Sequence, residues 1–448
     1  MTGMKQREID FGTEPVSRIL LTLAPPVMLA QLIQALYNIV DSFFIGRYDE
    51  NGLTALSIIY PMQLLMIALA VGTGVGINTG IAHFNGLKRH KRARDIAGVG
   101  TPLALFLWAL FALIAWLILP WYASISTDSP VVAGQVVQYG RLVCVFSIGL
   151  FLESIWTKVH QAEGDMKLPM VAQIVGALVN IALDPVLIFG FGPVAALGIK
   201  GAAIATVAGQ IVAAMIVWKG GYVPSPKRYQ YANYCRYIFG LGIPNILMQS
   251  AYTFYILGLN LILAGFCDQA VTALGLYYKW QTIFFIPLGA LQTCIVPILS
   301  YNYARKEIAR CRSTLRVALA GGIILMALGT LCFLLFPEQM LRVFSSDAKV
   351  IAIGTWGFRF VGVSFLGMVT SLIFPVFFQA TGYPVKSSLL TVLRTVVLFV
   401  PLGYLLSRFG LRFFWLTFPL TEAITTGVGF LFYRQFLKKE KQLTLKKD

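Results

Sequence analysis

Two aspartates, Asp41 and Asp184, lie inside long apolar stretches of this chain, at residues 17–45 and 169–190. A charged side chain in hydrocarbon costs at least about 2.5 to 3.5 kcal/mol, so such a residue normally faces a cavity, pairs with another group or takes up a proton. Two carboxylates in such stretches therefore indicate a site that holds H⁺ or binds a monovalent cation.

Two further oxygen-bearing side chains are expected at the same depth. Asn180 precedes Asp184 by four residues, so both lie on one face of a helix. Thr206 lies about nine residues into the stretch 197–218, near the depth of Asn180. Carboxylate, amide and hydroxyl oxygens can bind Na⁺, and carboxylates alone can hold H⁺, so these residues do not choose between the two ions. The alternative is that each aspartate only caps or bends its helix, as Asp184 followed by Pro185 allows.

Membrane-spanning helices must position these residues, because 57% of the chain is hydrophobic and 12% is charged. Apolar stretches long enough to span a bilayer recur throughout, and the alternating pattern of a β-barrel is missing. The polar segment 1–14 lacks the apolar core of a cleavable signal peptide. The sequence predicts an all-α polytopic membrane protein with twelve transmembrane helices. These are expected at residues 17–45, 53–82, 97–119, 132–158, 169–190, 197–218, 238–265, 271–300, 317–336, 350–378, 388–407 and 412–434.

The two halves of the chain repeat one another with a shift of 218 residues, from position 161 to position 379. The shift carries Gln-Ala-Glu-Gly at 161–164 onto Gln-Ala-Thr-Gly at 379–382, and Arg141 onto Arg359. Because each half has an even number of predicted spans, the halves form parallel repeats related by a pseudo-twofold axis along the membrane normal. The paired arginines are interpreted as sharing a structural role.

The repeat fails at both intramembrane aspartates. Asp41 corresponds to Leu259, and Asp184 corresponds to Leu402. The predicted ion site is therefore confined to the first half of a symmetric scaffold.

The chain has a net charge of +17, and its basic residues concentrate in alternate loops and at both ends. The positive-inside rule then predicts a multi-pass protein of the cytoplasmic membrane with both termini in the cytoplasm. Contact with anionic membrane lipids is a second expected role of these residues. Nucleic acid is not an expected partner, since no groove-reading module is recognisable.

The expected domains follow from the repeat and the loop charges. Residues 1–218 form a first lobe with the ion site, 219–237 a cytoplasmic linker, 238–435 a second lobe, and 436–448 a basic cytoplasmic tail.

Besides Arg359, three charged residues that lie well inside predicted spans of the second half need interpretation. Lys279 either meets a substrate anion or extends to the outer surface, and Arg394 is expected to extend to the inner surface. Glu422 is interpreted as a proton site, a partner for Lys279 or a hydrogen-bonded structural residue.

Two further features of the first half need interpretation. Pro25 and Pro26 are expected to bend the first span, and a bend that depends on the protonation of Asp41 is one hypothesis. A static kink is the alternative. Glu153 and Lys158 are expected near the inner surface, paired with loop charges.

The doubled six-span plan, Pro26, the two Gln-Ala-x-Gly loops and the pair Asn180 and Asp184 resemble the multidrug and toxic compound extrusion (MATE) transporters. The residues Gln34 and Tyr37 before Asp41 add to this resemblance, which covers essentially the whole chain. The match is most similar to the DinF-like and archaeal-type branch.

The resemblance implies a monomeric secondary active antiporter that exports amphipathic, often cationic small molecules in exchange for H⁺ or Na⁺ by alternating access, without a cofactor. It implies that Asp41 is the coupling carboxylate, that Tyr139 is its hydrogen-bond partner, and that Gln34 and Tyr37 face the substrate. It also implies an ion-binding network formed by Asp184, Asn180, Thr206 and the carbonyl group of Ala202. Acidic residues that the NorM-like branch has in its second lobe have no counterpart here.

Three other functions are less well supported by the sequence. A flippase for lipid-linked precursors, from the same superfamily, is the alternative, but it would be expected to have several cationic residues in its cavity. A membrane enzyme is disfavoured, because three scattered histidines and six cysteines without a CxxC pair form no catalytic or metal-binding group. A passive channel is disfavoured because the acids lie in one half only.

Overall fold

A computed structural model describes residues 10–192 and 195–445 of the chain. Within these ranges the regular elements are helices, which confirms the predicted all-α class. The first half contains α1 (Val16–Tyr48), α2 (Glu50–Gly86), α3 (His90–Ser126), α4 (Pro130–Val145), α5 (Ile148–Ala162), α6 (Lys167–Phe189) and α7 (Ile199–Gly221). The second half contains α8 (Tyr231–Ala264), α9 (Asp268–Ala304), α10 (Ile308–Leu335), α11 (Pro337–Arg342), α12 (Ala348–Ala380), α13 (Pro384–Val392), α14 (Phe399–Ser407), α15 (Leu411–Phe414) and α16 (Thr417–Leu445).

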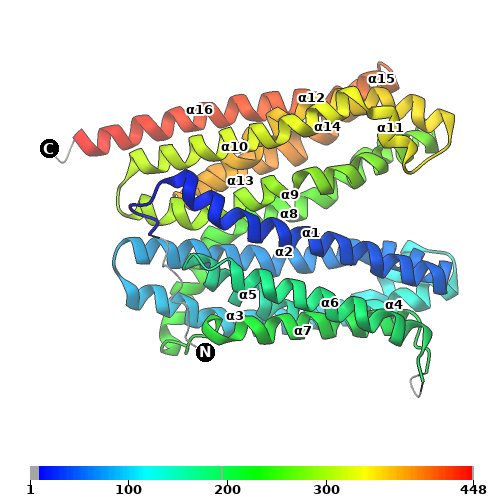
Figure 1. Ribbon diagram of the computed structural model, residues 1–448, viewed down its shortest axis with the longest axis horizontal. Helices are drawn as coiled ribbons and strands as arrows, with labels where there is room; N and C mark the ends of the chain where they lie inside the picture. Colours follow the sequence, from blue (N-terminus) through cyan, green and yellow to red (C-terminus); the bar gives the residue numbers. More distant parts are fainter. Residues whose placement is uncertain (1–9, 193–194, 446–448) are drawn as a thin grey trace. The chain divides into compact units, whose positions relative to one another are not determined.

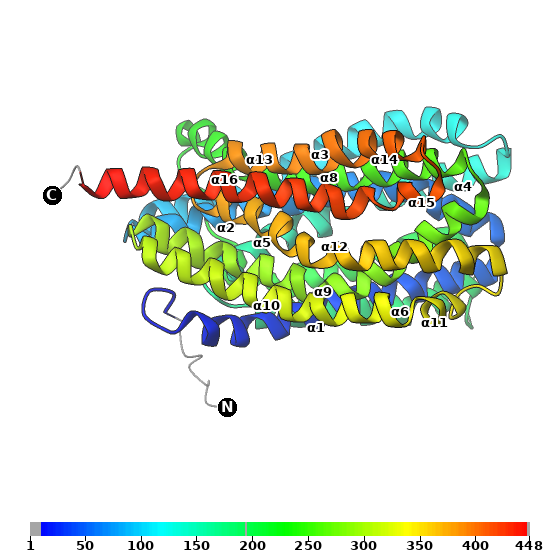
Figure 2. The same ribbon diagram turned by 90° about the horizontal axis from the view of Figure 1, so that it is seen from above.

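Ten helical segments of the described chain are long and apolar enough to cross a membrane. An eleventh span consists of α4 and α5, which meet at an angle of 41°. The Ser147 hydroxyl donates a hydrogen bond to the Cys144 carbonyl oxygen (2.7 Å) at this break, and such a bond competes with the helical ladder. The predicted twelfth span lies in α15 and α16, and α16 continues past it into a basic end that extends beyond its neighbour α12 (Figures 1 and 2).

The chain divides into two compact units, and the division does not fall in the predicted linker. Unit 1 is formed mainly by Leu21–Ile246, whereas unit 2 contains Phe11–Leu20 and the chain from Leu247 onward. The boundaries between the two units therefore lie within α1 and within α8. This differs from the expected limits 1–218 and 238–435.

Hydrogen bonds explain both displaced boundaries. The Ser225 hydroxyl donates to the Gly98 carbonyl oxygen (3.0 Å), and the Tyr234 hydroxyl donates to the Asp95 carboxylate (3.0 Å), so the linker and the start of α8 are fixed to unit 1. In unit 2, the Asn302 side chain donates to the Phe11 carbonyl oxygen (2.9 Å), as does the Arg310 guanidinium (2.8 Å). The segment before α1 is thereby held by α9 and α10.

Glycines allow the helices of unit 1 that carry the predicted site to pack closely. A Cβ atom on Gly176 of α6 would lie 2.7 Å from the Gly209 carbonyl oxygen, and one on Gly209 of α7 would lie 2.5 Å from the Gly176 carbonyl oxygen. A Cβ atom on Gly149 of α5 would lie 2.7 Å from the backbone nitrogen of Ile211 in α7. Since a side chain at any of these positions would separate the helices, the glycines determine how near the polar residues of α6 and α7 can lie.

Candidate functional site

The polar residues of α6 and α7 meet inside unit 1. Asn180 and Asp184 lie on α6, and Thr206 lies on the adjacent face of α7. The Asn180 amide nitrogen is 3.5 Å from an Asp184 carboxylate oxygen and 3.4 Å from the Thr206 hydroxyl oxygen. Asp184 is 0% exposed, although it is an acid, and it lies in the last two turns of a membrane-spanning helix. The expected i, i+4 pair thus forms a bridge between two helices.

Asp41 joins this group from α1. Its side chain is 7% exposed, and it is close enough to Asp184 for an electrostatic interaction. Tyr139 of α4 is buried, and the groups around its hydroxyl include Asp41, Gln63 and Thr206. The structure therefore brings together residues of α1, α4, α6 and α7 that are far apart in the sequence.

Several oxygens of this cluster have no hydrogen-bond partner. In the described chain, one carboxylate oxygen of Asp41, the second carboxylate oxygen of Asp184 and the amide oxygen of Asn180 are buried without a donor. A buried acceptor without a partner is costly, and most native structures avoid it. Three such acceptors in one cluster form an environment in which a proton or a small cation is stabilised.

The alternative interpretation of the aspartates as local caps does not fit their surroundings. Asp41 and Asp184 both lie within helices, at residues that do not begin or end them. The partner of Asp184 is the side chain of Asn180 rather than a free backbone amide. Ala202 is fully buried on α7, one turn before Thr206, as the predicted network requires.

Arg141 does not neutralise these acids. Its guanidinium carbon lies 4.1 Å from the centre of the Trp116 ring, in a cation–π contact, and its Nε atom is buried without an acceptor. Arg359, at the corresponding place in the second half, is exposed. The two arginines therefore have different surroundings, and the expected shared role is not supported.

A third acid of unit 1 was placed incorrectly by the sequence. Glu153 was expected to pair with loop charges, but it is buried on α5 and accepts a hydrogen bond from the Thr157 hydroxyl (2.8 Å). Lys158 donates from its Nζ atom to the side-chain oxygen of Gln161 (2.8 Å) and interacts electrostatically with Glu153. The 218-residue shift carries Glu153 onto Ser371. This mismatch between the repeats is the signal that could have identified Glu153.

The remaining predicted residues of unit 1 lie on α1. Gln34 is exposed, and Tyr37 is half-buried within electrostatic reach of Asp41, Asp184 and Glu153. Pro25 and Pro26 are both inside α1, which continues through them as one helix from Val16 to Tyr48. Gln34 and Tyr37 thus lie on the helix that carries Asp41, with Tyr37 near all three acids.

In unit 2 the intramembrane acid pairs with Arg394 and not with Lys279, which was one of its three interpretations. Glu422 of α16 forms a buried ion pair with Arg394, with 2.6 Å between a terminal guanidinium nitrogen and a carboxylate oxygen. The guanidinium Nε atom lies 3.0 and 3.2 Å from the two carboxylate oxygens, and the Ser371 hydroxyl also donates to Glu422. Lys279 is exposed instead, with its ammonium group 5.1 Å from the Phe344 ring.

Arg394 was expected to extend to the inner surface, and this was wrong. It lies on a π-helical turn over Leu393–Leu398 between α13 and α14. A π-helical turn inserts an extra residue and rotates the following side chains relative to an α-helix. The buried carboxylate of Glu422 balances the charge of Arg394, so its side chain does not need to reach water.

Both halves of the chain match one protein family. The MatE family model matches twice, over residues 26–186 and 244–405. The chain is similar to a FAD transporter of Shewanella oneidensis, with 24% identity over 426 residues and 92% of each chain covered. It is also similar to the multidrug export protein MepA of Staphylococcus saprophyticus, with 23% identity over 414 residues and 90% of each chain covered.

Two solved structures show the same fold. One is an outward-facing multidrug resistance MATE family transporter of the MOP superfamily, with a TM-score of 0.90, 20% identity, and 98% of this chain and 100% of that chain covered. The other is a MOP superfamily transporter from Pyrococcus furiosus, with a TM-score of 0.89, 21% identity and the same coverage. These neighbours confirm the predicted fold of twelve transmembrane helices in two repeats. The chain belongs to the MatE family, whose members are membrane transporters and not enzymes.

Proposed function

We propose that this transporter exports amphipathic organic cations in exchange for H⁺ or Na⁺, and that Asp41 and Asp184 bind the coupling ion. The observation that carries this proposal is the group of buried acceptor oxygens on Asp41, Asp184 and Asn180 that have no donor among the described residues. A bound proton or Na⁺ would satisfy them. When that ion leaves, the two carboxylates regain their charge and attract an organic cation.

The distribution of charge between the units supports a cationic substrate. In unit 1, Asp41, Asp184 and Glu153 are buried; Glu153 interacts electrostatically with Lys158, whereas no Lys or Arg among the described residues forms an ion pair with Asp41 or Asp184. In unit 2 the buried acid Glu422 is neutralised by Arg394. The electrostatic attraction for a cation is therefore concentrated in unit 1.

Aromatic side chains beside these acids would add to cation recognition. Tyr37 lies within electrostatic reach of Asp41, Glu153 and Tyr60. A tyrosine ring next to carboxylates suits a bulky cation, because the ring face attracts positive charge and the carboxylates balance it. The related protein named as a multidrug exporter is in accord with this proposal.

Two anionic substrate classes are less well supported. The similar FAD transporter suggests an anionic dinucleotide, and the flippase alternative requires recognition of a lipid pyrophosphate. Either substrate would need several cations in one site, yet Arg394 is already paired with Glu422, and Lys279 is a single exposed cation beside Phe344. The acids of unit 1 would also repel both substrates.

The proposed location and orientation in the membrane follow from the charges of the loops. The chain lies in the cell membrane with both termini in the cytoplasm, since Lys and Arg concentrate in the segments assigned to that side. It acts as a monomer, and exchange requires only the ion gradient.

The proposal is tested by export of a cationic dye from proteoliposomes driven by a pH gradient or a Na⁺ gradient, applied separately. Wild type should export under at least one gradient, whereas Asp41→Asn and Asp184→Asn should lose gradient-driven export. Asp268→Asn, at an exposed aspartate at the start of α9, serves as the control and should behave as wild type. Undiminished export by both Asn variants would remove Asp41 and Asp184 from the coupling site.

A further inference from the structure

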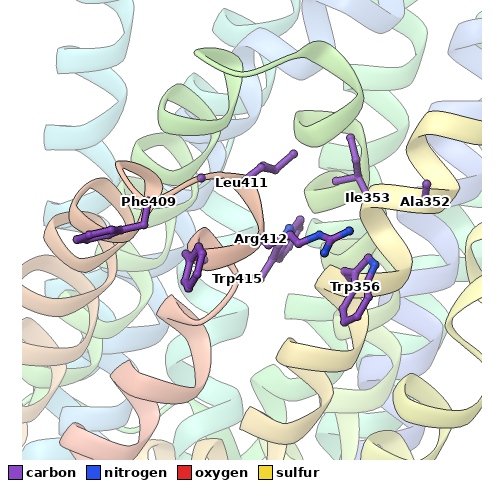
Figure 3. A pocket seen from close by; sticks show the side chains of 9 residues that line it. Ala352, Ile353, Trp356, Phe409, Leu411, Arg412 and Trp415 are labelled. Carbon is purple, nitrogen blue, oxygen red and sulfur yellow. The ribbon is translucent and has the colours of Figure 1, made fainter.

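A groove at one end of unit 2 is separate from the proposed ion site. It has a volume of about 440 Å³ and lies between the first turns of α12 and residues 409–415, which include α15 (Figure 3). Ile353 and Trp356 form one side, and Leu411, Arg412 and Phe413 form the other. This volume is within the range of sites that bind small organic molecules.

One side chain of the groove has a charge without a counter-charge. The Arg412 guanidinium carbon lies 4.9 Å from the centre of the Trp356 ring, and Figure 3 shows the two side chains next to each other. Within residues 10–192 and 195–445, no carboxylate forms an ion pair with Arg412. The ring contact fixes the guanidinium while its N–H groups remain able to bind an oxyanion, which guanidinium groups do in a bidentate manner.

The rest of the groove is apolar and aromatic. Trp356 is 44% exposed and Phe413 is 50% exposed, so large apolar surfaces are left uncovered beside the charge. Trp415 is buried at the base of the groove, and its indole nitrogen has no acceptor in the described chain. The position at the ends of membrane-spanning helices is where Trp and Arg side chains meet lipid headgroups.

The repeat indicates that the groove is a specific feature of the second half. The 218-residue shift carries Trp356 onto Gln138, Arg412 onto Val194 and Trp415 onto Leu197. The common scaffold therefore does not require this combination of residues.

From these observations we propose that the groove binds a phospholipid with a singly anionic phosphodiester headgroup. The phosphate accepts hydrogen bonds from Arg412, and an acyl chain covers Trp356, Ile353 and Phe413. A single unpaired guanidinium balances one negative charge, so a phosphatidylglycerol-type headgroup fits better than a polyanion. A zwitterionic lipid brings a second, positive group, which has no carboxylate partner in the groove. The occupant is thus a component of the membrane rather than the exported compound.

Native mass spectrometry of the full-length protein in detergent tests this proposal, with phosphatidylglycerol and phosphatidylcholine of identical acyl chains added at equal concentration. Wild type should retain phosphatidylglycerol preferentially. Arg412→Gln should weaken its retention about tenfold, as expected for the loss of a charge-assisted hydrogen bond. Arg408→Gln is the matched control, because Arg408 is exposed just before residues 409–415 and its guanidinium lies 4.8 Å from the Tyr404 ring.

A second measurement locates the lipid. Phosphatidylglycerol with brominated acyl chains quenches tryptophan fluorescence at close range, so replacement of Trp356 by Phe should remove a quenchable component that wild type shows. Arg412, Arg408 and Trp356 are all exposed, and the unfolding temperature of each variant in phosphatidylcholine verifies its folding. Equal retention of both lipids by wild type would overturn the proposal. So would an Arg412→Gln variant that retains phosphatidylglycerol as well as Arg408→Gln does, or quenching that is unchanged in Trp356→Phe.

Discussion

The buried pair of Arg394 and Glu422 yields the sharpest stability prediction. Their side chains are 6% and 1% exposed, and the guanidinium makes three contacts of 2.6 to 3.2 Å with the carboxylate. Glu422→Gln keeps the shape but leaves the guanidinium buried without a counter-charge. Breaking a buried pair in this way costs about 3 to 5 kcal/mol, because water cannot replace the lost partner.

An exposed pair in the same unit offers a matched control. Arg342 and Glu338 are 2.7 Å apart, but their side chains are 63% and 52% exposed. Glu338→Gln should cost at most about 1 kcal/mol, since water solvates the remaining arginine. The assay is the free energy of unfolding of the purified protein, measured by titration with SDS in mixed micelles.

A double variant separates charge from packing. Replacing both Arg394 and Glu422 by Met removes both charges and keeps much of the volume, so most of the stability lost in Glu422→Gln should return. The reasoning would be refuted if Glu422→Gln cost no more than Glu338→Gln. It would also be refuted if the double variant were less stable than Glu422→Gln.

Three further predictions concern unit 1. Glu153→Gln should raise the half-saturating concentration of a cationic dye about tenfold in the transport assay, equivalent to about 1.4 kcal/mol of lost attraction. The half-saturating concentration of a neutral analogue should not change. An equal effect on both compounds would indicate a structural role for Glu153. Gly209→Ala should destabilise the protein by about 1 to 3 kcal/mol, because its Cβ atom would lie 2.5 Å from a carbonyl oxygen of α6. Gly240→Ala should not destabilise the protein, because no atom lies within 4 Å of its Cβ position. Equal unfolding free energies of the two variants in SDS titrations would contradict the close packing at Gly209. Hydrogen bonds, first of all with His160, hold the pKa of Asp165 below its ordinary value. Its contribution to stability is therefore present above about pH 3.9 and is lost as the pH falls through the lower folded-state pKa. Asp165→Asn should lower the unfolding temperature at neutral pH, and the difference from wild type should shrink at acid pH; a difference that does not vary with pH would argue against this pair.

The helices, and the grouping of Asn180, Asp184 and Thr206, could be predicted from the sequence for a physical reason. Crossing a bilayer requires long apolar stretches, and their lengths and order are visible without any tertiary information. The spacing of Asn180 and Asp184 places them on one face of a single helix, and their depth matches that of Thr206 on the next. The contacts between α6 and α7 agree with this inference.

Depth in the membrane could be inferred, but direction around a helix axis could not. Arg394 was expected at a surface because a long basic side chain near a helix end can extend to water, whereas a buried acid on another helix, Glu422, pairs with it inside the unit. Glu153 was assigned to a surface pair, although it is buried beside Thr157. The division between units within α1 and α8 depends on long-range hydrogen bonds, which composition and periodicity do not reveal.

The central claim is that the acids of unit 1 couple an ion to substrate binding. It is tested most directly by measuring the affinity of the purified protein for an organic cation as a function of pH and of Na⁺ concentration, in wild type and in Asp41→Asn. Because the ion and the substrate compete for the same carboxylates, wild-type affinity should fall as H⁺ or Na⁺ rises, by up to tenfold for each tenfold increase in a singly bound ion. Asp41→Asn should bind with an affinity that no longer depends on that ion, whereas full retention of the wild-type dependence would contradict the claim.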